Sequence, residues 1–452
     1  MTAQGGRPGR QTGVIDGVAV MVGVVIGVGI FRTPPLVAGF VDSSVAFLAV
    51  WVAGGLVMLT GALCYAELAS RYPDTGGEYH FLSRAFGRPV AILFGWARGT
   101  VIQTGGIAAV AFVFGDYANT LIPLGGQGPA LYAGASIVLF TSLNLAGTRQ
   151  GQLAQRLFTL TIVALMLLLI ALGLHHFDPA VLDTQRPATL GSGASALGMA
   201  MVFVLLTFGG WNEAAYLSAE MRDQRHGMVR VLLVGSLLLI TLYLLINMSY
   251  LGVLGLEGIR QSDAVAAGMM GAVAGEGGAR IMTLVVIVAT LSTLNATLLT
   301  GSRVYHALGR DLPPLSGLGV WSRRGDNPAN ALMVQCVLSL LLVLVGSMSR
   351  DGFEAMVDYT APVFWFFLML VGSSLLVLRR RERQNPSGTE GFRVPLYPLL
   401  PVLFCLVCAG LVYSSLLNAG FGGVLGVAVV ALGLPLLHWR RREPEPVSDA
   451  SS

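Results

Sequence analysis

The 452-residue chain contains no lysine, and all 28 of its basic residues are arginine. Arginine stays protonated at every physiological pH, so mechanisms that need an amine of adjustable pKa, Schiff-base chemistry among them, are excluded. Charged residues of either sign are also scarce, at 12%, which is about half the share of an average soluble protein. This scarcity of charge argues against a water-soluble fold.

Cysteine is nearly as rare. Cys64, Cys336, Cys405 and Cys408 all lie in long apolar stretches, so no disulfide framework is expected. Cys405 and Cys408 have C-x-x-C spacing, but small residues at i and i+3 of an apolar helix are typical of packing. The apolar stretches hold no serine, histidine and acid arrangement and no metal-ligand cluster. We therefore expect no catalytic residue, cofactor or metal ion, and no enzyme.

Hydrophobic residues are abundant instead, at 54% of the chain. Apolar runs of the roughly 20 residues that cross a bilayer recur along its length, which predicts an all-α polytopic membrane protein. Twelve spans are expected, near residues 14–40, 44–66, 89–115, 129–146, 153–174, 193–218, 229–253, 279–302, 330–348, 355–378, 395–417 and 421–439.

The arginines set the expected orientation of these spans. With the amino terminus inside, the outer loops keep only Arg186, Arg260, Arg280 and Arg350, so the positive-inside rule places both termini in the cytoplasm. We expect a multi-pass protein of the plasma (inner) membrane. The pI near 9.0 then reflects topology and lipid contact, and no nucleic-acid partner is expected. We expect disordered tails at residues 1–12 and 441–452 around a transmembrane domain at 13–440.

The first span carries an interruption within residues 23–35. Gly27 and Gly29 weaken the helix there, and Pro34 and Pro35 withhold two amide donors downstream. Inside a bilayer, unwound backbone is tolerated only where it is buried in protein or lines a cavity. This break is therefore the first candidate for a substrate site, although Gly23-x-x-x-Gly27 taken alone is typical of close helix packing.

A second interruption, Phe208-Gly209-Gly210-Trp211-Asn212-Glu213, lies five spans later. Interrupted spans in corresponding places of two halves indicate an inverted repeat with its binding site near the membrane midplane. The repeats would be residues 13–175 and 193–378, followed by two further helices within 395–439.

Two broken helices suit a zwitterion. Amides at the amino end of a half-helix attract a carboxylate, and released carbonyls accept from an ammonium group. The expected amide donors are Gly27, Val28, Gly29 and Ile30. The expected carbonyl acceptors are Val25, Ile26, Leu206, Phe208 and Gly209, with Gly210 beside them.

The sequence allows two interpretations of the role of several polar side chains. Glu213 either carries a proton or pairs with Arg98 or Arg32, and the pair is favoured; Arg32 is otherwise expected to snorkel outward. Gln103, Trp211 and Asn212 are candidate gating or supporting residues. Ser292 and Thr293 either resemble an ion site or bond to neighbouring helices.

These residues resemble amino-acid permeases of the amino acid, polyamine and organocation superfamily, particularly the L-amino-acid and serine/threonine exchanger branch. The resemblance covers nearly the whole chain, through residues 27–31, 64–79, 209–212 and 302–311. It implies a LeuT-type fold of five plus five inverted repeats and two further helices, working by alternating access. It also implies that Gly27, Val28 and Gly29 bind the carboxylate, and that Val25, Leu206 and Gly209 bind the amino group.

Two positions depart from that family. Val28 stands where relatives often have serine, and Ile162 aligns with a lysine that many relatives use in place of a sodium ion. Because Ile162 replaces that lysine, exchange is favoured over proton symport. Small or medium neutral amino acids are the expected substrates, because no acidic residue besides Glu213 is positioned to pair with a cationic side chain. The alternatives are a polyamine or cationic amino-acid carrier with Glu213 as countercharge, and a membrane amino-acid sensor that does not transport.

Overall fold

The computed structural model describes residues 13–438 except 75, 147–148, 178, 180–193, 219–220, 224–225, 323–326, 385–390 and 419. The expected tails at 1–12 and 441–452 lie outside this part of the chain. In the first half, the helices are α1 Val14–Val25, α2 Gly29–Gly39, α3 Ser44–Arg71, α4 Glu78–Phe86, α5 Arg88–Ala97, the π-helix η1 Arg98–Gln103, α6 Thr104–Leu121, α7 Gly128–Ala146 and α8 Arg149–His175. The second half contains α9 Ala194–Thr207, the 3-10 helix η3 Trp211–Leu217, α10 Gly227–Arg260, α11 Val265–Asp311, η4 Pro313–Gly319, α12 Ala329–Gly346, α13 Gly352–Gln384, α14 Leu399–Asn418, α15 Gly420–Ala431 and η5 Leu434–His438.

The prediction of an all-helical, polytopic membrane protein is confirmed. Within the described residues, 10 spans are long and apolar enough to cross a bilayer, and the bent pair of α1 and α2 makes up to 11. The expected fifth span falls in α8, where Thr161–His175 is a shorter apolar helix. Large hydrophobic side chains of α7, α12, α14 and α15 face outward, as the faces of a bilayer-spanning helix must.

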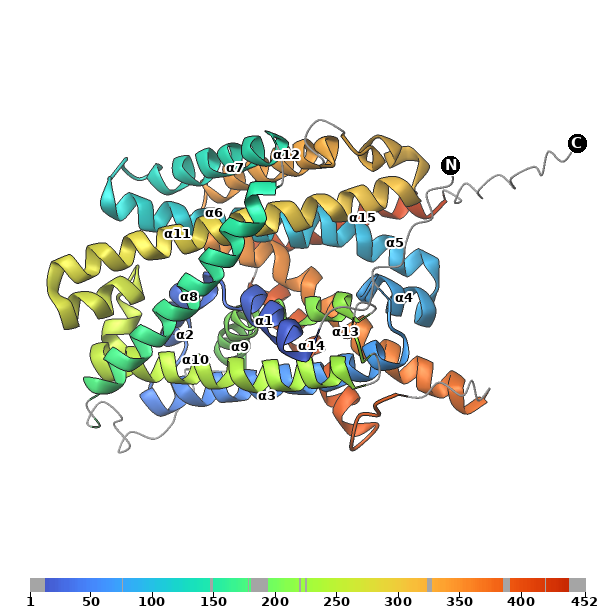
Figure 1. Cartoon of the computed structure of the whole chain (residues 1–452), viewed down its shortest axis with the longest axis horizontal. Helices are drawn as coiled ribbons and strands as arrows, with labels where there is room; N and C mark the ends of the chain where they lie inside the picture. Colours follow the sequence, from blue (N-terminus) through green and yellow to red (C-terminus); the bar gives the residue numbers. More distant parts are fainter. Residues whose placement is uncertain are drawn as a thin grey trace, which may run out of the picture.

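Long helices surround short ones. In Figure 1 the short helices α1, α2 and α9 lie in the middle of the molecule. On one side α3 packs along α10, on the other α6, α7, α11 and α12 pack together, and α8 runs between α10 and α11. This arrangement buries the interrupted segments in protein, where their free backbone groups are sheltered from lipid.

Candidate functional site: a cavity between two interrupted helices

The first interruption covers residues 26–28. α1 ends at Val25, α2 begins at Gly29, and the two helices are bent by 54°. The amides in the first turn of α2 have no acceptor within their own helix. The predicted break is therefore present, and it presents the positive end of a helix dipole.

The second interruption follows α9. This helix ends at Thr207, residues 208–210 form a turn, and η3 begins at Trp211. Gly210 has φ +102°, a conformation that side chains rarely adopt. The carbonyl of Gly210 accepts from the Glu213 amide at 3.0 Å. The glycine thus lets the chain turn sharply and places Asn212 and Glu213 just beyond the turn.

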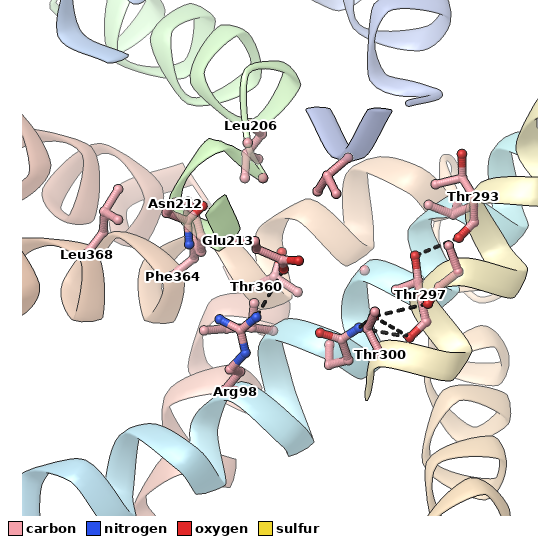
Figure 2. A pocket seen from close by; sticks show the side chains of 18 of the residues that line it. Arg98, Leu206, Asn212, Glu213, Thr293, Thr297, Thr300, Thr360, Phe364 and Leu368 are labelled. Atoms are coloured by element: carbon pink, nitrogen blue, oxygen red, sulfur yellow. Dashed lines mark hydrogen bonds and ion pairs between the residues drawn. The ribbon is translucent and has the colours of Figure 1, made fainter. Parts of the chain in front are cut away.

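A cavity of about 340 Å³ lies between these two breaks (Figure 2). Its walls come from α1, α4, α5, η1, α6, α8, α9, η3, α11 and α13. The expected site residues that line it are Ile26, Gln103, Leu206, Gly209, Gly210, Asn212, Glu213 and Thr293. Ile162 also lines it, so an apolar side chain faces the cavity at this position.

The other expected residues lie close by but are not among the lining residues. The Val25 carbonyl accepts from the Tyr243 hydroxyl at 2.9 Å and from the Gly27 amide at 2.8 Å. A Cβ on Gly27 would lie 3.8 Å from Thr293, and one on Gly29 would lie 3.3 Å from Thr207. Val28 and Ile30 are buried in the core. Gly29 is therefore a contact between α2 and α9.

Two aromatic residues and one serine of the expected site also pack into the protein. Phe208 is fully buried against Trp51 and Tyr243. Trp211 packs edge-on against Tyr65, with ring centroids 4.8 Å apart. Ser292 is 1% exposed on α11. All three support the walls around the cavity.

A charged cluster occupies one end of the cavity. Arg98 donates from Nη1 to Glu78 Oε2 at 2.8 Å and from Nη2 to Glu213 Oε1 at 3.0 Å; the latter pair is drawn in Figure 2. Glu78 also accepts from the Tyr65 hydroxyl at 2.6 Å and from the Asn212 amide at 2.9 Å. Glu213 therefore forms an ion pair with Arg98. Of the two roles considered for Glu213 from the sequence, ion pairing was the favoured one.

The π-helix η1 positions both Arg98 and Gln103 in this cavity. A π-helix shifts the hydrogen-bond register, and such segments are frequent at functional sites. Here two tyrosine hydroxyls donate to carbonyls of η1: Tyr305 to Gly99 at 2.9 Å, and Tyr359 to Thr100 at 3.0 Å. Side chains from α11 and α13 thereby hold the segment in place.

Hydroxyl groups form the opposite wall. Thr293, Thr297 and Thr300 of α11 line the cavity and follow one another along the helix in Figure 2. Gln103 donates from Nε2 to the Thr297 carbonyl at 2.9 Å and to Thr300 Oγ1 at 3.3 Å. The aromatic side chains of Phe364 and Phe367 make another wall apolar.

A second charged cluster lies on the other side of the break. α1 packs against η3, whereas α2 packs against α9, so Arg32 of α2 is on the half away from Glu213. Arg32 pairs with Asp351 and, at 3.7 Å, with Asp116. The expectation that Arg32 snorkels outward is wrong, because these carboxylates hold the guanidinium and leave the residue only 8% exposed.

Four polar residues line the cavity without having been predicted from the sequence: Glu78, Thr297, Thr300 and Thr360. The arginine at position 98, in the middle of an apolar stretch, was the available signal for a buried partner. No group of three His, Cys, Asp or Glu side chains able to hold a metal ion occurs among the described residues. The cavity presents polar groups from Gln103 and the threonines of α11, and charged groups from Arg98, Glu78 and Glu213.

Comparison with known proteins identifies the family. The model of the amino acid permease family matches residues 13–427. The human b(0,+)-type amino acid transporter 1 is 29% identical over 423 residues, 90% of this chain and 83% of the relative. The serine/threonine exchanger SteT of Bacillus subtilis is 24% identical over 440 residues, 96% of this chain and 97% of the relative.

The human large neutral amino acids transporter small subunit 2 is 25% identical over 457 residues, 97% of this chain and 82% of the relative. These similarities agree with the interrupted first helix and with the cavity beside it. The chain is thus an amino acid transporter and not an enzyme, and it belongs to the amino acid permease family.

Proposed function

We propose that this protein is a secondary active transporter that moves small or medium neutral L-amino acids across the plasma membrane by alternating access. The observation that carries the proposal is one cavity that meets both interrupted helices. The fold is a LeuT-type arrangement in which α1–α8 and α9–α13 are inverted repeats and α14 and α15 are additional. Both termini lie in the cytoplasm, and the bilayer surrounds the bundle.

The zwitterion is held by main-chain groups. Amides at the start of α2 receive the carboxylate, because the helix dipole favours an anion there. Carbonyls near Ile26 and from Leu206 to Gly209 accept from the ammonium group; Ile26, Leu206 and Gly209 line the cavity. Since the Val25 carbonyl already accepts two hydrogen bonds, it has the least capacity for the substrate.

Exchange of one amino acid for another is favoured over proton symport. The side chain of Ile162 cannot carry a proton or replace a sodium ion at the cavity wall. Glu213, the other candidate carrier, is held by Arg98 at 3.0 Å. The exchanged amino acid itself then resets the transporter.

The two charged clusters suit gates on opposite sides of the substrate. Arg98 joins η1, η3 and the start of α4 through Glu213 and Glu78. Arg32 joins α2 to α6 and to the start of α13 through Asp116 and Asp351. Alternating access requires that the contacts on one side break while those on the other side hold.

A polyamine or cationic amino-acid carrier is the second candidate, because Glu213 places a carboxylate at the cavity wall. Competition by arginine or putrescine against a neutral amino acid separates the two. The candidate of another class is a membrane sensor that binds an amino acid without transporting it. For a sensor we expect binding of the amino acid without uptake.

The test is uptake of a panel of labelled amino acids into proteoliposomes, with and without internal amino acid and with imposed proton or sodium gradients. We expect uptake that depends on internal amino acid and not on either gradient. Uptake into empty vesicles driven by a proton gradient would refute exchange. Binding of labelled amino acid without any uptake would favour the sensor.

A further inference from the structure

The amide of Gln103 is fixed with its oxygen toward the cavity. Its Nε2 donates to the Thr297 carbonyl at 2.9 Å and to Thr300 Oγ1 at 3.3 Å. A carbonyl oxygen only accepts, so this contact requires the nitrogen and sets the orientation of the whole amide. Gln103 lines the cavity while only 7% exposed. Its Oε1 receives no hydrogen bond from the described residues.

The neighbouring hydroxyl groups are also oriented as acceptors. Thr293 donates to the Ala289 carbonyl at 3.2 Å, Thr297 to the Thr293 carbonyl at 2.7 Å, and Thr300 to the Ala296 carbonyl at 3.1 Å. Their protons therefore point into α11. The lone pairs of Thr293 and Thr297 remain for the cavity, whereas Thr300 uses one of its two to accept from Gln103. We call Gln103, Thr293, Thr297 and Thr300 the acceptor wall.

The acceptor wall extends along α11 from the first break. Thr293 lies opposite Gly27, since a Cβ on Gly27 would be 3.8 Å from it. At a rise of 1.5 Å per residue, Thr300 lies about 10 Å further along the helix. A substrate whose carboxylate and ammonium groups occupy the break can thus extend its side chain along the wall, in the direction of Gln103.

The charges near the wall exclude acidic side chains. Arg98, the cationic residue of the cavity, is paired with both Glu78 and Glu213. A substrate carboxylate at the wall would face only acceptors there, and leaving a buried polar group unpaired costs about 1–3 kcal/mol, more when it is charged. A side chain with N–H or O–H groups instead satisfies the free Oε1.

We propose that Gln103 is a specificity-determining residue, whose Oε1 selects amino acids with hydrogen-bond-donating side chains, glutamine above all. This inference rests on the proposed transport function and names the substrate class of the same cavity. Glutamine has an unbranched side chain that ends in an amide, and this amide donates. Methionine has a similar length without a donor, and glutamate has a similar shape but accepts only.

The test is competition by glutamine, methionine and glutamate against uptake of a labelled amino acid that the wild type transports. We expect glutamine to compete best and glutamate worst. In Gln103→Leu the apparent affinity for glutamine should fall about five- to tenfold relative to methionine, the equivalent of one net hydrogen bond. Gln103→Met is the second variant, should the leucine variant fail to fold.

Gln335→Leu is the matched control. Gln335 is a fully buried glutamine that also packs at Gly301, yet it donates to the Leu298 carbonyl and is not among the lining residues. Its variant should keep the glutamine-to-methionine ratio of the wild type. An unchanged ratio in both folded Gln103 variants would overturn the proposal while transport itself persists. Wild-type protein that takes up no amino acid would instead overturn the proposed function.

Discussion

Replacing Arg98 with glutamine should destabilise the protein mainly through Glu78. The two ion pairs of Arg98 have similar lengths, 2.8 and 3.0 Å, but different surroundings: the Glu78 side chain is 4% exposed and that of Glu213 is 34% exposed. A hydrogen bond to a buried charged group contributes about 1.5–3 kcal/mol. An ion pair in contact with water contributes about 0.2–1 kcal/mol.

A double-mutant cycle separates the two pairs. We expect Arg98→Gln and Glu78→Gln to be coupled by about 2 kcal/mol in the free energy of unfolding, and Arg98→Gln and Glu213→Gln by less than about 1 kcal/mol. In Arg98→Gln, Glu78 keeps its hydrogen bonds from Tyr65 and Asn212. The coupling energy between Arg98 and Glu78 is therefore lower than the full cost of an unpaired buried charge.

The free energies of unfolding are measured in mixed micelles as the fraction of a denaturing detergent is raised. The measurement covers the wild type, the three single variants and the two double variants. The result that refutes the reasoning is a coupling to Glu213 as large as the coupling to Glu78. It would mean that water does not screen the ion pair between Arg98 and Glu213, although the Glu213 side chain is 34% exposed.

Three further changes are informative. Glu213→Gln should leave the shape of the pH profile of initial uptake rates unchanged, and a flattened profile would identify Glu213 as a proton carrier. Gly29→Ala should lower the melting temperature, because its Cβ would lie 3.3 Å from Thr207 and overpacking costs about 1–3 kcal/mol. The control is Gly39→Ala, whose Cβ would have nothing within 4 Å. Equal melting temperatures of the two variants would contradict the contact between Gly29 and Thr207. Gly106→Val should preserve folding, because a Cβ at this position meets nothing within 4 Å. It should reduce the uptake of leucine more than that of alanine, because Gly106 lines the cavity. If uptake assays show an unchanged preference for substrate size, this part of the cavity holds no substrate.

Local sequence was enough to predict where the helices break. Gly27 and Gly29 act on their own backbone, and the helix does stop at Val25 and resume at Gly29. Gly209 and Gly210 predict the second interruption for the same reason. The apolar runs likewise predicted the spans, since each run is a property of consecutive residues.

The contacts across the cavity could not be predicted in this way. Arg98 meets Glu213 across 115 positions, and the tyrosines that hold η1 lie 206 and 259 positions beyond their acceptors. The sequence left Glu213 with two partners, Arg98 and Arg32, because helix order alone does not say which faces meet. Gln103 and Glu213 were selected for their polarity, whereas Thr297 and Thr300 look like ordinary helix residues until α11 packs against η1.

The π-helix η1 separates the register of the helix before it from that of the helix after it. In a regular α-helix, turning Arg98 toward a new partner would rotate every later side chain as well. In η1, the tyrosine hydroxyls of α11 and α13 accommodate the change of register, so the helix before η1 and the helix after it can each keep its own face. A substitution of Gln103, at the far end of η1, is therefore expected to leave the ion pairs of Arg98 in place.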